Sequence, residues 1–237
     1  MIGFDDPELV RREYATEDGL RARAAVYEGV AGPDARDTAF EAVREAEPAR
    51  VLEVGCGWGE FAERLMKELG VEVVAVDQSS RMVELSRERG VDARIADAQQ
   101  LPFEDGSFDV SVANWMLYHV PDLDGALSEL ARVLRPGGRL VAATNSLDHL
   151  GELWSLVGRN RHEEPVRFFS ERAEEPLLRH FSSVERRDVK SSVTLDEDAA
   201  RGYIASSVVH KHLADRVPEF DGPLVATRWN TIFVATK

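Results

Sequence analysis

A short apolar run that ends in three alternating glycines constrains this chain more than any other feature. Residues 51–54 read Val-Leu-Glu-Val, and Gly55, Gly57 and Gly59 follow. An apolar run of this length that stops at glycine is typical of a buried parallel strand. Glycine lets the backbone turn sharply and leaves no Cβ in the way of a ligand. Because helical spacing starts at Glu60, the pattern predicts a strand, a tight loop and a helix whose first amides face a ligand.

Apolar runs and helical segments alternate along the rest of the chain at intervals that predict a mostly parallel sheet. Further strands are expected at residues 71–76, 93–96, 108–113, 139–144, 184–195 and 229–235. Helices are expected at residues 60–69, 79–90, 123–134 and 196–213. With the strand before the glycines, these elements form an α/β fold with a seven-stranded sheet and helices on both faces.

The remaining segments are less regular and suggest additions to this sheet. Residues 1–48 are polar and charged, with helical patterns at 21–30 and 34–46 that Gly32-Pro33 separates, so we expect an N-terminal helical cap. Residues 49–237 form the main domain on this interpretation. Residues 148–182, after the fifth strand, form an inserted cap segment.

Two kinds of cofactor suit a glycine loop, and the charges beside it separate them. A dinucleotide loop of the form G-x-G-x-x-G needs its third glycine at position 60, which here is Glu60. Carboxylates at Glu53 and Glu60 would repel a pyrophosphate and suit a cation. S-adenosyl-L-methionine carries an amino group and a sulfonium and no phosphate. The alternative that the glycines only make a tight turn stays open.

Further motifs follow the loop in an order that resembles the class I S-adenosylmethionine-dependent methyltransferases, in the subgroup of ubiquinone/menaquinone and small-molecule methylases. The matching segments are residues 51–59, 74–77, 97–103, 108–110, 117–120 and 134–138. The resemblance covers roughly residues 50–145. It implies a Rossmann-like fold, S-adenosyl-L-methionine as cofactor, and methyl transfer to an O, N or C nucleophile of a small molecule.

The resemblance also assigns cofactor contacts to residues after the second and third strands. Asp77 would accept both ribose hydroxyls, with Gln78 beside the adenosine. Asp97 would accept the adenine amino group, and the amide of Ala98 would face the ring. The alternatives are that Asp77 is an exposed residue at a strand end and that Asp97 caps the following turn.

Residues after the fourth strand are candidates for the methionine end of the cofactor and for catalysis. By resemblance, Asn114 lies near that end, and Trp115 forms a wall of the pocket or packs in the core. His119 is the candidate general base because histidine titrates near neutrality; a structural hydrogen bond in the loop is its alternative. From the cap, Tyr14 or Tyr27 would face the transferring methyl group, or only pack.

Two other histidine patterns are candidates for pocket or metal roles. His149 and Glu152 are three residues apart, so they could share one face of a helix. That face would be either a wall of the pocket or a solvated surface. His210 and His212 have no acidic cluster with ligand spacing beside them, so no metal site is predicted.

Composition limits the partners and the compartment. The formal net charge is −14, which disfavours a nucleic-acid substrate because phosphates would be repelled. Cys56 is the single cysteine, and no signal peptide or membrane span is recognisable, so a cytoplasmic protein is expected. The oligomeric state is not predicted. Two alternatives to methyl transfer remain, a nicotinamide-dependent oxidoreductase and a noncatalytic S-adenosylmethionine-binding module.

Overall fold

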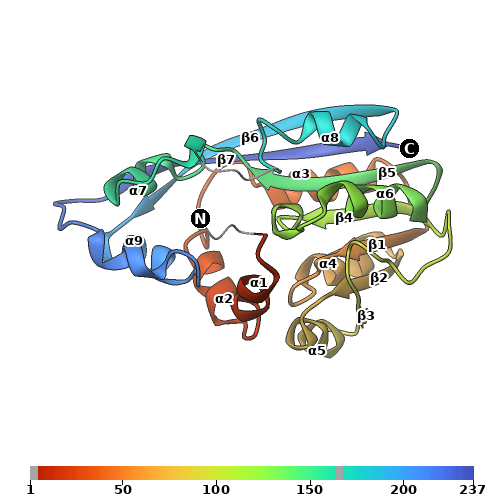
Figure 1. The fold of residues 1–237 in the computed structure, drawn as a ribbon, viewed down its shortest axis with the longest axis horizontal. Helices are drawn as coiled ribbons and strands as arrows, with labels where there is room; N and C mark the ends of the chain where they lie inside the picture. The colour runs from red at the N-terminus through yellow and green to blue at the C-terminus, as the bar shows by residue number, and fades with distance from the viewer. Residues whose placement is uncertain (1–4, 164–167) are drawn as a thin grey trace.

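A seven-stranded sheet forms the centre of the molecule in a computed structural model, which describes residues 5–163 and 168–237 (Figure 1). The strand order is β3-β2-β1-β4-β5-β7-β6. The strands are β1 (Arg50–Val54), β2 (Glu72–Asp77), β3 (Asp92–Ile95), β4 (Phe108–Asn114), β5 (Leu134–Asn145), β6 (Ser183–Leu195) and β7 (Leu224–Thr236).

The sheet is parallel except around β7. Strands β3, β2, β1, β4 and β5 pair in parallel, whereas β7 runs antiparallel to both β5 and β6. The prediction of a mostly parallel seven-stranded α/β sheet is therefore confirmed. In a parallel sheet all carboxyl ends lie at one edge, so the ends of β1, β2 and β4 meet where the chain order reverses on either side of β1.

Helices cover both faces of this sheet because its strands are apolar on both sides. The helices are α1 (Pro7–Glu13), α2 (Asp18–Ala25), α3 (Ala35–Arg44), α4 (Glu60–Leu69), α5 (Ser80–Glu88), α6 (Leu123–Val133), α7 (Gly151–Leu156), α8 (Glu174–Leu178) and α9 (Glu197–Ala205). Helices α3, α4 and α5 pack with Val51 and Val112 on one face. Helices α6 and α8 pack with Leu52 and Val76 on the other.

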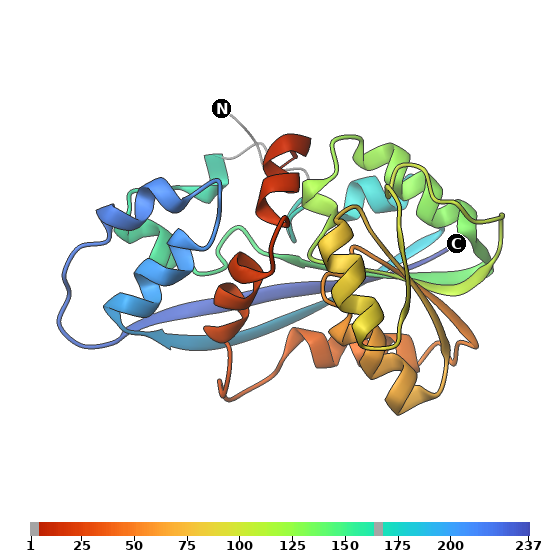
Figure 2. The same cartoon turned by 90° about the horizontal axis from the view of Figure 1, so that it is seen from below.

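The N-terminal segment divides into two parts with different packing. Helix α3 buries Ala39, Phe40 and Val43 against the sheet. Helices α1 and α2 lie instead beside the carboxyl edge of the strands, between α5 and α9 (Figures 1 and 2). We therefore propose that the cap consists of α1 and α2, and that α3 belongs to the sheet domain rather than to a cap of residues 1–48.

The antiparallel pair β6–β7 extends past the other strands and carries a small core of its own. Residues 224–229 of β7 pair with β6 alone, since the pairing of β7 with β5 begins at Asn230. Leu153 of α7 and Ile204 of α9 pack there with Val193 and Ala226. Figure 2 shows α9 on this extension. Helix α7, from the first part of the inserted segment, thus joins α9 at the end of the sheet, whereas α8, from its last part, packs in the main core.

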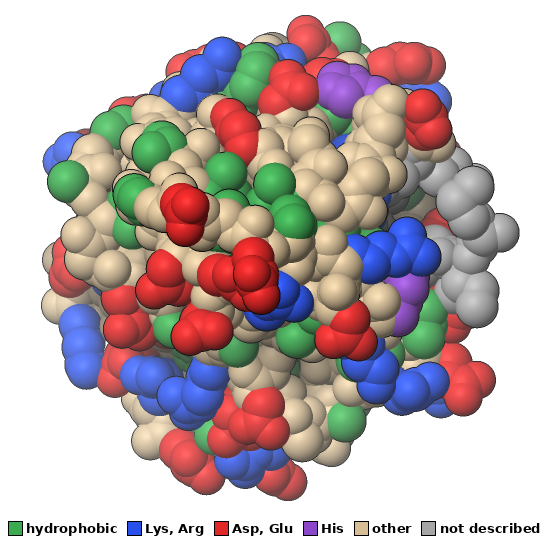
Figure 3. Space-filling model, turned by 90° about the vertical axis from the view of Figure 1, so that its left-hand side faces the viewer, with side chains coloured by type: hydrophobic (Ala, Val, Ile, Leu, Met, Phe, Trp, Pro, Cys, Tyr) green, Lys and Arg blue, Asp and Glu red, His purple; other side chains and the backbone are tan. Residues whose placement is uncertain are grey.

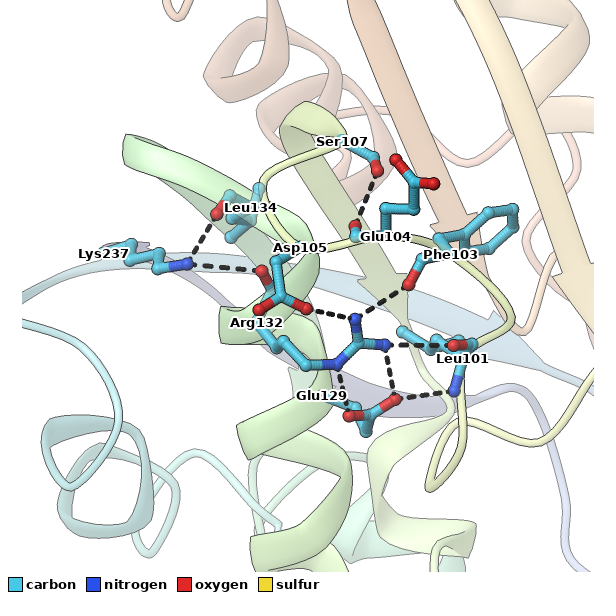
Figure 4. A network of polar contacts seen from close by, with 9 residues as sticks. All are labelled: Leu101, Phe103, Glu104, Asp105, Ser107, Glu129, Arg132, Leu134 and Lys237. Atoms are coloured by element: carbon cyan, nitrogen blue, oxygen red, sulfur yellow. Dashed lines mark hydrogen bonds and ion pairs between the residues drawn. The ribbon is translucent and has the colours of Figure 1, made fainter.

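The loop between β3 and β4 is fixed by Arg132 of α6 (Figure 4). Its guanidinium donates to the carbonyl oxygens of Leu101 (3.0 Å) and Phe103 (2.8 Å) and pairs with Asp105 (2.7 Å). Glu129, held by the same arginine, accepts from the Leu101 amide at 2.8 Å. Because this network holds the loop on α6, Asp97 at its start has a defined position.

Several boundaries differ from the sequence-based expectation. The helix expected at 21–30 lies at Asp18–Ala25, and the one expected at 196–213 ends at Ala205, before a 3₁₀ helix at Lys211–Arg216. Helix α1 was not expected, although Asp6 caps it and Pro7 opens it. Strand β5 starts at Leu134, five residues before the strand expected at 139–144. No helix in the described part of the chain is long and apolar enough to span a bilayer.

Candidate functional site

A cavity of about 1140 Å³ opens at the carboxyl ends of β1, β2 and β4. The N-terminal segment closes its other side, with Val10, Tyr14, Leu20 and Tyr27 in the wall. The predicted cofactor and catalytic residues in its lining are Glu53, Gly55, Gly57, Asp77, Gln78, Asp97, Ala98, Asn114, Trp115, Tyr14 and His119. The structure therefore brings together residues that come from distant parts of the sequence. Gly59 alone among the predicted residues is not in the lining.

The glycine loop has two kinds of glycine. A Cβ on Gly59 would lie 2.8 Å from the Cα of Ser86, so this glycine allows α5 to pack against the loop. Gly57 has φ +53°, and its amide donates to Asp77 Oδ2 at 3.0 Å. A Cβ there would meet Leu20 at 3.4 Å, an ordinary contact. Gly57 thus presents bare backbone to the cavity, whereas Gly59 serves packing.

This difference predicts the effect of Gly57→Ala. The new methyl group fits the protein but occupies ligand space, so affinity for S-adenosylhomocysteine should fall at least about tenfold, which is about 1.4 kcal/mol. Gly70→Ala is the matched control, since Gly70 also has positive φ (+68°) and a Cβ there meets nothing within 4 Å. Both variants should lose about 1–2 kcal/mol of stability from the left-handed backbone. Calorimetry that gave equal affinities for both would contradict this placement.

The carboxylates after β2 and β3 hold backbone amides and face the cavity. Asp77 accepts from Gly57 N and from Ser79 N (2.9 Å). Burial raises the pKa of Asp77, and the bonds from the Ser79 and Gly57 amides oppose that rise. Asp97 accepts from the Gln99 amide at 2.9 Å, so it caps the turn as the alternative expected. A carboxylate has about four acceptor sites, so both can also bind a ligand donor.

Glu53 of β1 and Asn114 of β4 line the cavity with side-chain atoms that have no partner among the described residues. Glu53 is 3% exposed, and burial, reinforced by the charge of Asp77, raises its pKa to about 8. Its Oε2 and both amide atoms of Asn114 are buried without a hydrogen bond to any described residue. Unpaired buried polar atoms are costly and call for an explanation. A ligand with an ammonium group and hydrogen-bonding atoms would satisfy them.

Trp115 takes a strained backbone at the end of β4. Its φ is +52°, a conformation that bulky residues rarely adopt. Its ring nitrogen donates to Asn145 Oδ1 at 3.1 Å, and its ring packs against the α3–α4 face of the core. The predicted alternatives of wall and core packing are thus combined. Strain of this kind tends to occur at functional sites.

The two predicted catalytic residues are in direct contact. The hydroxyl of Tyr14 lies 2.9 Å from His119 Nε2, with the rings edge to face. Burial is the main cause that raises the pKa of Tyr14 to about 12, so its hydroxyl keeps its proton at neutral pH. Tyr14 also accepts at its backbone oxygen from Ser79 Oγ (2.7 Å), which ties the cap to α5.

A second tyrosine–histidine contact lies in the wall of the same cavity. Tyr27 Oη is 3.0 Å from His149 Nε2 and 3.4 Å from Tyr203 Oη. Burial, followed by the charge of Arg161, lowers the pKa of His149 to about 3, so it is neutral. Glu152 does not share this face, because it binds the Thr227 amide and hydroxyl.

Some lining residues were missed by the sequence analysis. They are Gln99, Asn145, Tyr203, Arg228 and Asn230. The sequence could have indicated Asn145, because this asparagine directly follows a predicted strand, as Asn114 does. Gln99 comes from a loop, Tyr203 from α9, and Arg228 and Asn230 from β7, where the sequence carries no recognisable site motif. No metal-binding group of three or more His, Cys, Asp or Glu occurs within residues 5–163 and 168–237.

Comparisons with known proteins agree on one family. Residues 52–142 match the profile of a family described as "Methyltransferase domain". A malonyl-[acyl-carrier protein] O-methyltransferase of Yersinia pestis is 38% identical over 117 residues, which are 47% of this chain and 43% of the relative. The chain thus matches less than half the length of that relative. The family profile itself spans the glycine loop, Asp77 and Asp97.

Solved structures extend the likeness to the whole fold. A Thermotoga maritima methyltransferase, described as a possible histamine N-methyltransferase, is 22% identical with a TM-score of 0.62, covering 95% of this chain and 99% of its own. A Haemonchus contortus phosphoethanolamine N-methyltransferase in complex with S-adenosyl-L-methionine is 18% identical with a TM-score of 0.64, covering 99% of this chain and 60% of its own. Residues 52–142 therefore match a methyltransferase domain, and the chain as a whole shares the fold of solved S-adenosylmethionine-dependent methyltransferases.

Proposed function

We propose that this protein transfers a methyl group from S-adenosyl-L-methionine to an O, N or C nucleophile of a small molecule. The observation that carries the proposal is the set of buried polar atoms around one cavity at the ends of β1, β2 and β4. Glu53 and Asn114 lack partners there among the described residues. Asp77 keeps acceptor capacity beside the glycine loop.

Each part of the cofactor has candidate partners in this cavity. Asp77, with Gln78 beside it, suits the two ribose hydroxyls. Asp97 and the Ala98 amide suit the adenine, at the entrance to the loop that Arg132 holds. Glu53 and Asn114 suit the amino acid end, where an ammonium group would complete a buried ion pair.

The Tyr14–His119 pair suits proton transfer from the acceptor. When bound, the cofactor supplies a methyl group on a sulfonium, which becomes a neutral thioether as the acceptor gains its new bond. A protonated acceptor must then lose a proton, and Tyr14 can pass it to His119 across their 2.9 Å contact. Exclusion of water and alignment of the acceptor would supply much of the rate.

The cap is proposed to close over the bound cofactor. Besides Tyr14, Glu17 pairs with Arg81 of α5 at 3.0 Å. We expect S-adenosylhomocysteine to slow hydrogen exchange in α1 and α2, because these contacts then hold a filled site. Helix α8, on the far side of the sheet core, is the internal control and should not respond. If the exchange rates in α1 and α2 are the same with and without S-adenosylhomocysteine, the proposal that the cap closes over the cofactor is wrong.

The net charge supports a proposal about the substrate class, and the single cysteine supports one about the cellular compartment. On the face shown in Figure 3, basic and acidic side chains are interspersed rather than collected into a basic area. With a net charge of −14, this supports a small-molecule substrate rather than a nucleic acid. Buried Cys56, with no second cysteine, supports a reducing compartment such as the cytoplasm.

Calorimetry and isotope transfer test the function. The protein should bind S-adenosylmethionine and S-adenosylhomocysteine and should not bind NAD⁺ or NADPH. Incubation of a small-molecule extract with CD₃-labelled S-adenosylmethionine should then place the label on a metabolite. Binding of a nicotinamide nucleotide alone would overturn the proposal in favour of an oxidoreductase. Cofactor binding without any label transfer would favour a noncatalytic module.

A further inference from the structure

A second, smaller cavity of about 110 Å³ adjoins the first, and Tyr14 and His119 line both. No glycine of the loop lines the small cavity, and the residues that line both cavities are Val10, Tyr14, Arg23, Tyr118, His119, Asn145 and Tyr203. A ligand in the small cavity would therefore meet the candidate catalytic pair without occupying the proposed cofactor site.

Asn145, at the end of β5, has an amide whose orientation is fixed by chemistry. Its Oδ1 accepts from Trp115 Nε1 at 3.1 Å and from Asn230 Nδ2 at 2.6 Å. An indole N–H can only donate, so the atom facing Trp115 must be the oxygen. The NH₂ group then lies on the other arm of the planar amide. The side-chain NH₂ group of Asn145 donates no hydrogen bond to any residue in the described ranges, and Asn145 lines both cavities.

The charged residues around the small cavity are mostly cations. In the described part of the chain, its lining holds Arg23, Arg159 and Arg161 but only one carboxylate, Glu13, which pairs with Arg23. Arg161 is 7% exposed and donates to the His149 carbonyl at 2.9 Å. A guanidinium has five N–H donors and can hold a protein oxygen and a ligand oxygen together.

The remaining walls add neutral and aromatic surface. Burial, followed by the charges of Arg159 and Arg161, lowers the pKa of His210 to about 3, so this histidine adds no charge. Tyr118, Trp154 and Phe169 supply aromatic faces. Such walls suit a flat apolar body, and the donors suit an acidic group attached to it.

We propose that the small cavity binds the methyl acceptor through an anionic oxygen group, a carboxylate or a phosphate, with the Asn145 amide donating to one of its oxygens. This inference rests on the proposed methyl transfer, since it places the acceptor next to Tyr14 and His119. Asn145 is then a substrate-binding residue. The strained Trp115 backbone fits this role, because Trp115 holds the Asn145 oxygen and so aims its NH₂ group.

Asn145→Asp separates substrate binding from structure. The variant keeps an oxygen that can accept from Trp115 and Asn230, but replaces the cavity donor with a second anionic oxygen. The probes are 4-fluorobenzoate, 4-fluorophenyl phosphate and neutral 4-fluorobenzamide, titrated by ¹⁹F NMR into protein saturated with S-adenosylhomocysteine. We expect an acid to bind more tightly than the benzamide, and Asn145→Asp to weaken it at least about tenfold, as loss of one charge-assisted bond implies.

The control is Asn160→Asp, which makes the same charge change at an exposed residue beside Arg159 and Arg161. It should change probe affinity much less. The relative affinity of benzoate and phosphate identifies which acid is preferred. The inference is overturned if benzamide binds as well as the acids, if Asn145→Asp has no effect, or if both variants weaken binding equally. If S-adenosylhomocysteine itself fails to bind, the proposed function has failed; if it binds and no probe does, this inference alone has failed.

Discussion

Asp77→Ala is expected to abolish most of the affinity for S-adenosylhomocysteine while leaving a folded protein. Loss of two charge-assisted hydrogen bonds to the ribose, at about 1.5–3 kcal/mol each, lowers affinity by roughly 100-fold or more. The structure adds a second effect, because Asp77 also accepts from the amides of Gly57 and Ser79. The variant should therefore lose some stability without ligand as well.

Asp109→Ala is the matched control for Asp77→Ala. Asp109 also accepts from two backbone amides, those of Ala49 (2.7 Å) and Arg50 (2.8 Å), but it does not line the cavity. Chemical unfolding should show a loss of stability in both variants, whereas calorimetry should show a loss of affinity in Asp77→Ala alone. Equal affinities in the two variants would mean that Asp77 only holds the loop.

The part of the site that the sequence predicted lies on the parallel strands. Glycines, apolar runs and a carboxylate at a strand end occupy fixed positions relative to the sheet, so Gly57, Asp77 and Asp97 could be placed at one edge before any coordinates were known. The same pattern did not separate Gly59, whose packing on Ser86 depends on how closely α5 approaches the loop. Local sequence does not encode that distance.

The rest of the site depends on contacts between distant segments. Tyr14 and His119 were each candidates, but their contact joins residues 105 positions apart and requires α1 to fold over the cavity. Tyr203 and Asn230 reach the cavity because β7 runs antiparallel and carries α9 on its extension with β6. No spacing rule predicts where such an extension ends, so these residues had no signal in the sequence.

Glu53→Gln should abolish a loss of stability that wild type shows as the pH rises. In the folded state Glu53 has a pKa of about 8, against an ordinary value of 4.5. Below the ordinary value both states hold the proton and nothing is lost. As the pH rises toward 8, the unfolded chain ionises while the folded chain keeps its proton, so stability falls by about 1.4 kcal/mol per pH unit, or about 3 kcal/mol by pH 7. Glutamine cannot ionise, so this decline should be absent in the variant.

Urea unfolding from about pH 5 to about pH 8 measures this difference. The variant should be more stable than wild type near pH 8 and similar in stability near pH 5. Glu72→Gln, at the exposed start of β2, should have the same pH dependence as wild type.

Cofactor binding should change the protonation of Glu53 in the opposite direction. An ammonium beside Glu53 favours the carboxylate, so wild type should release a proton on binding S-adenosylhomocysteine near pH 7, and Glu53→Gln should bind more weakly without release. Because a merely structural glutamate predicts the stability change but no proton release, calorimetry in buffers of different ionisation enthalpy decides whether this buried carboxyl group meets the cofactor.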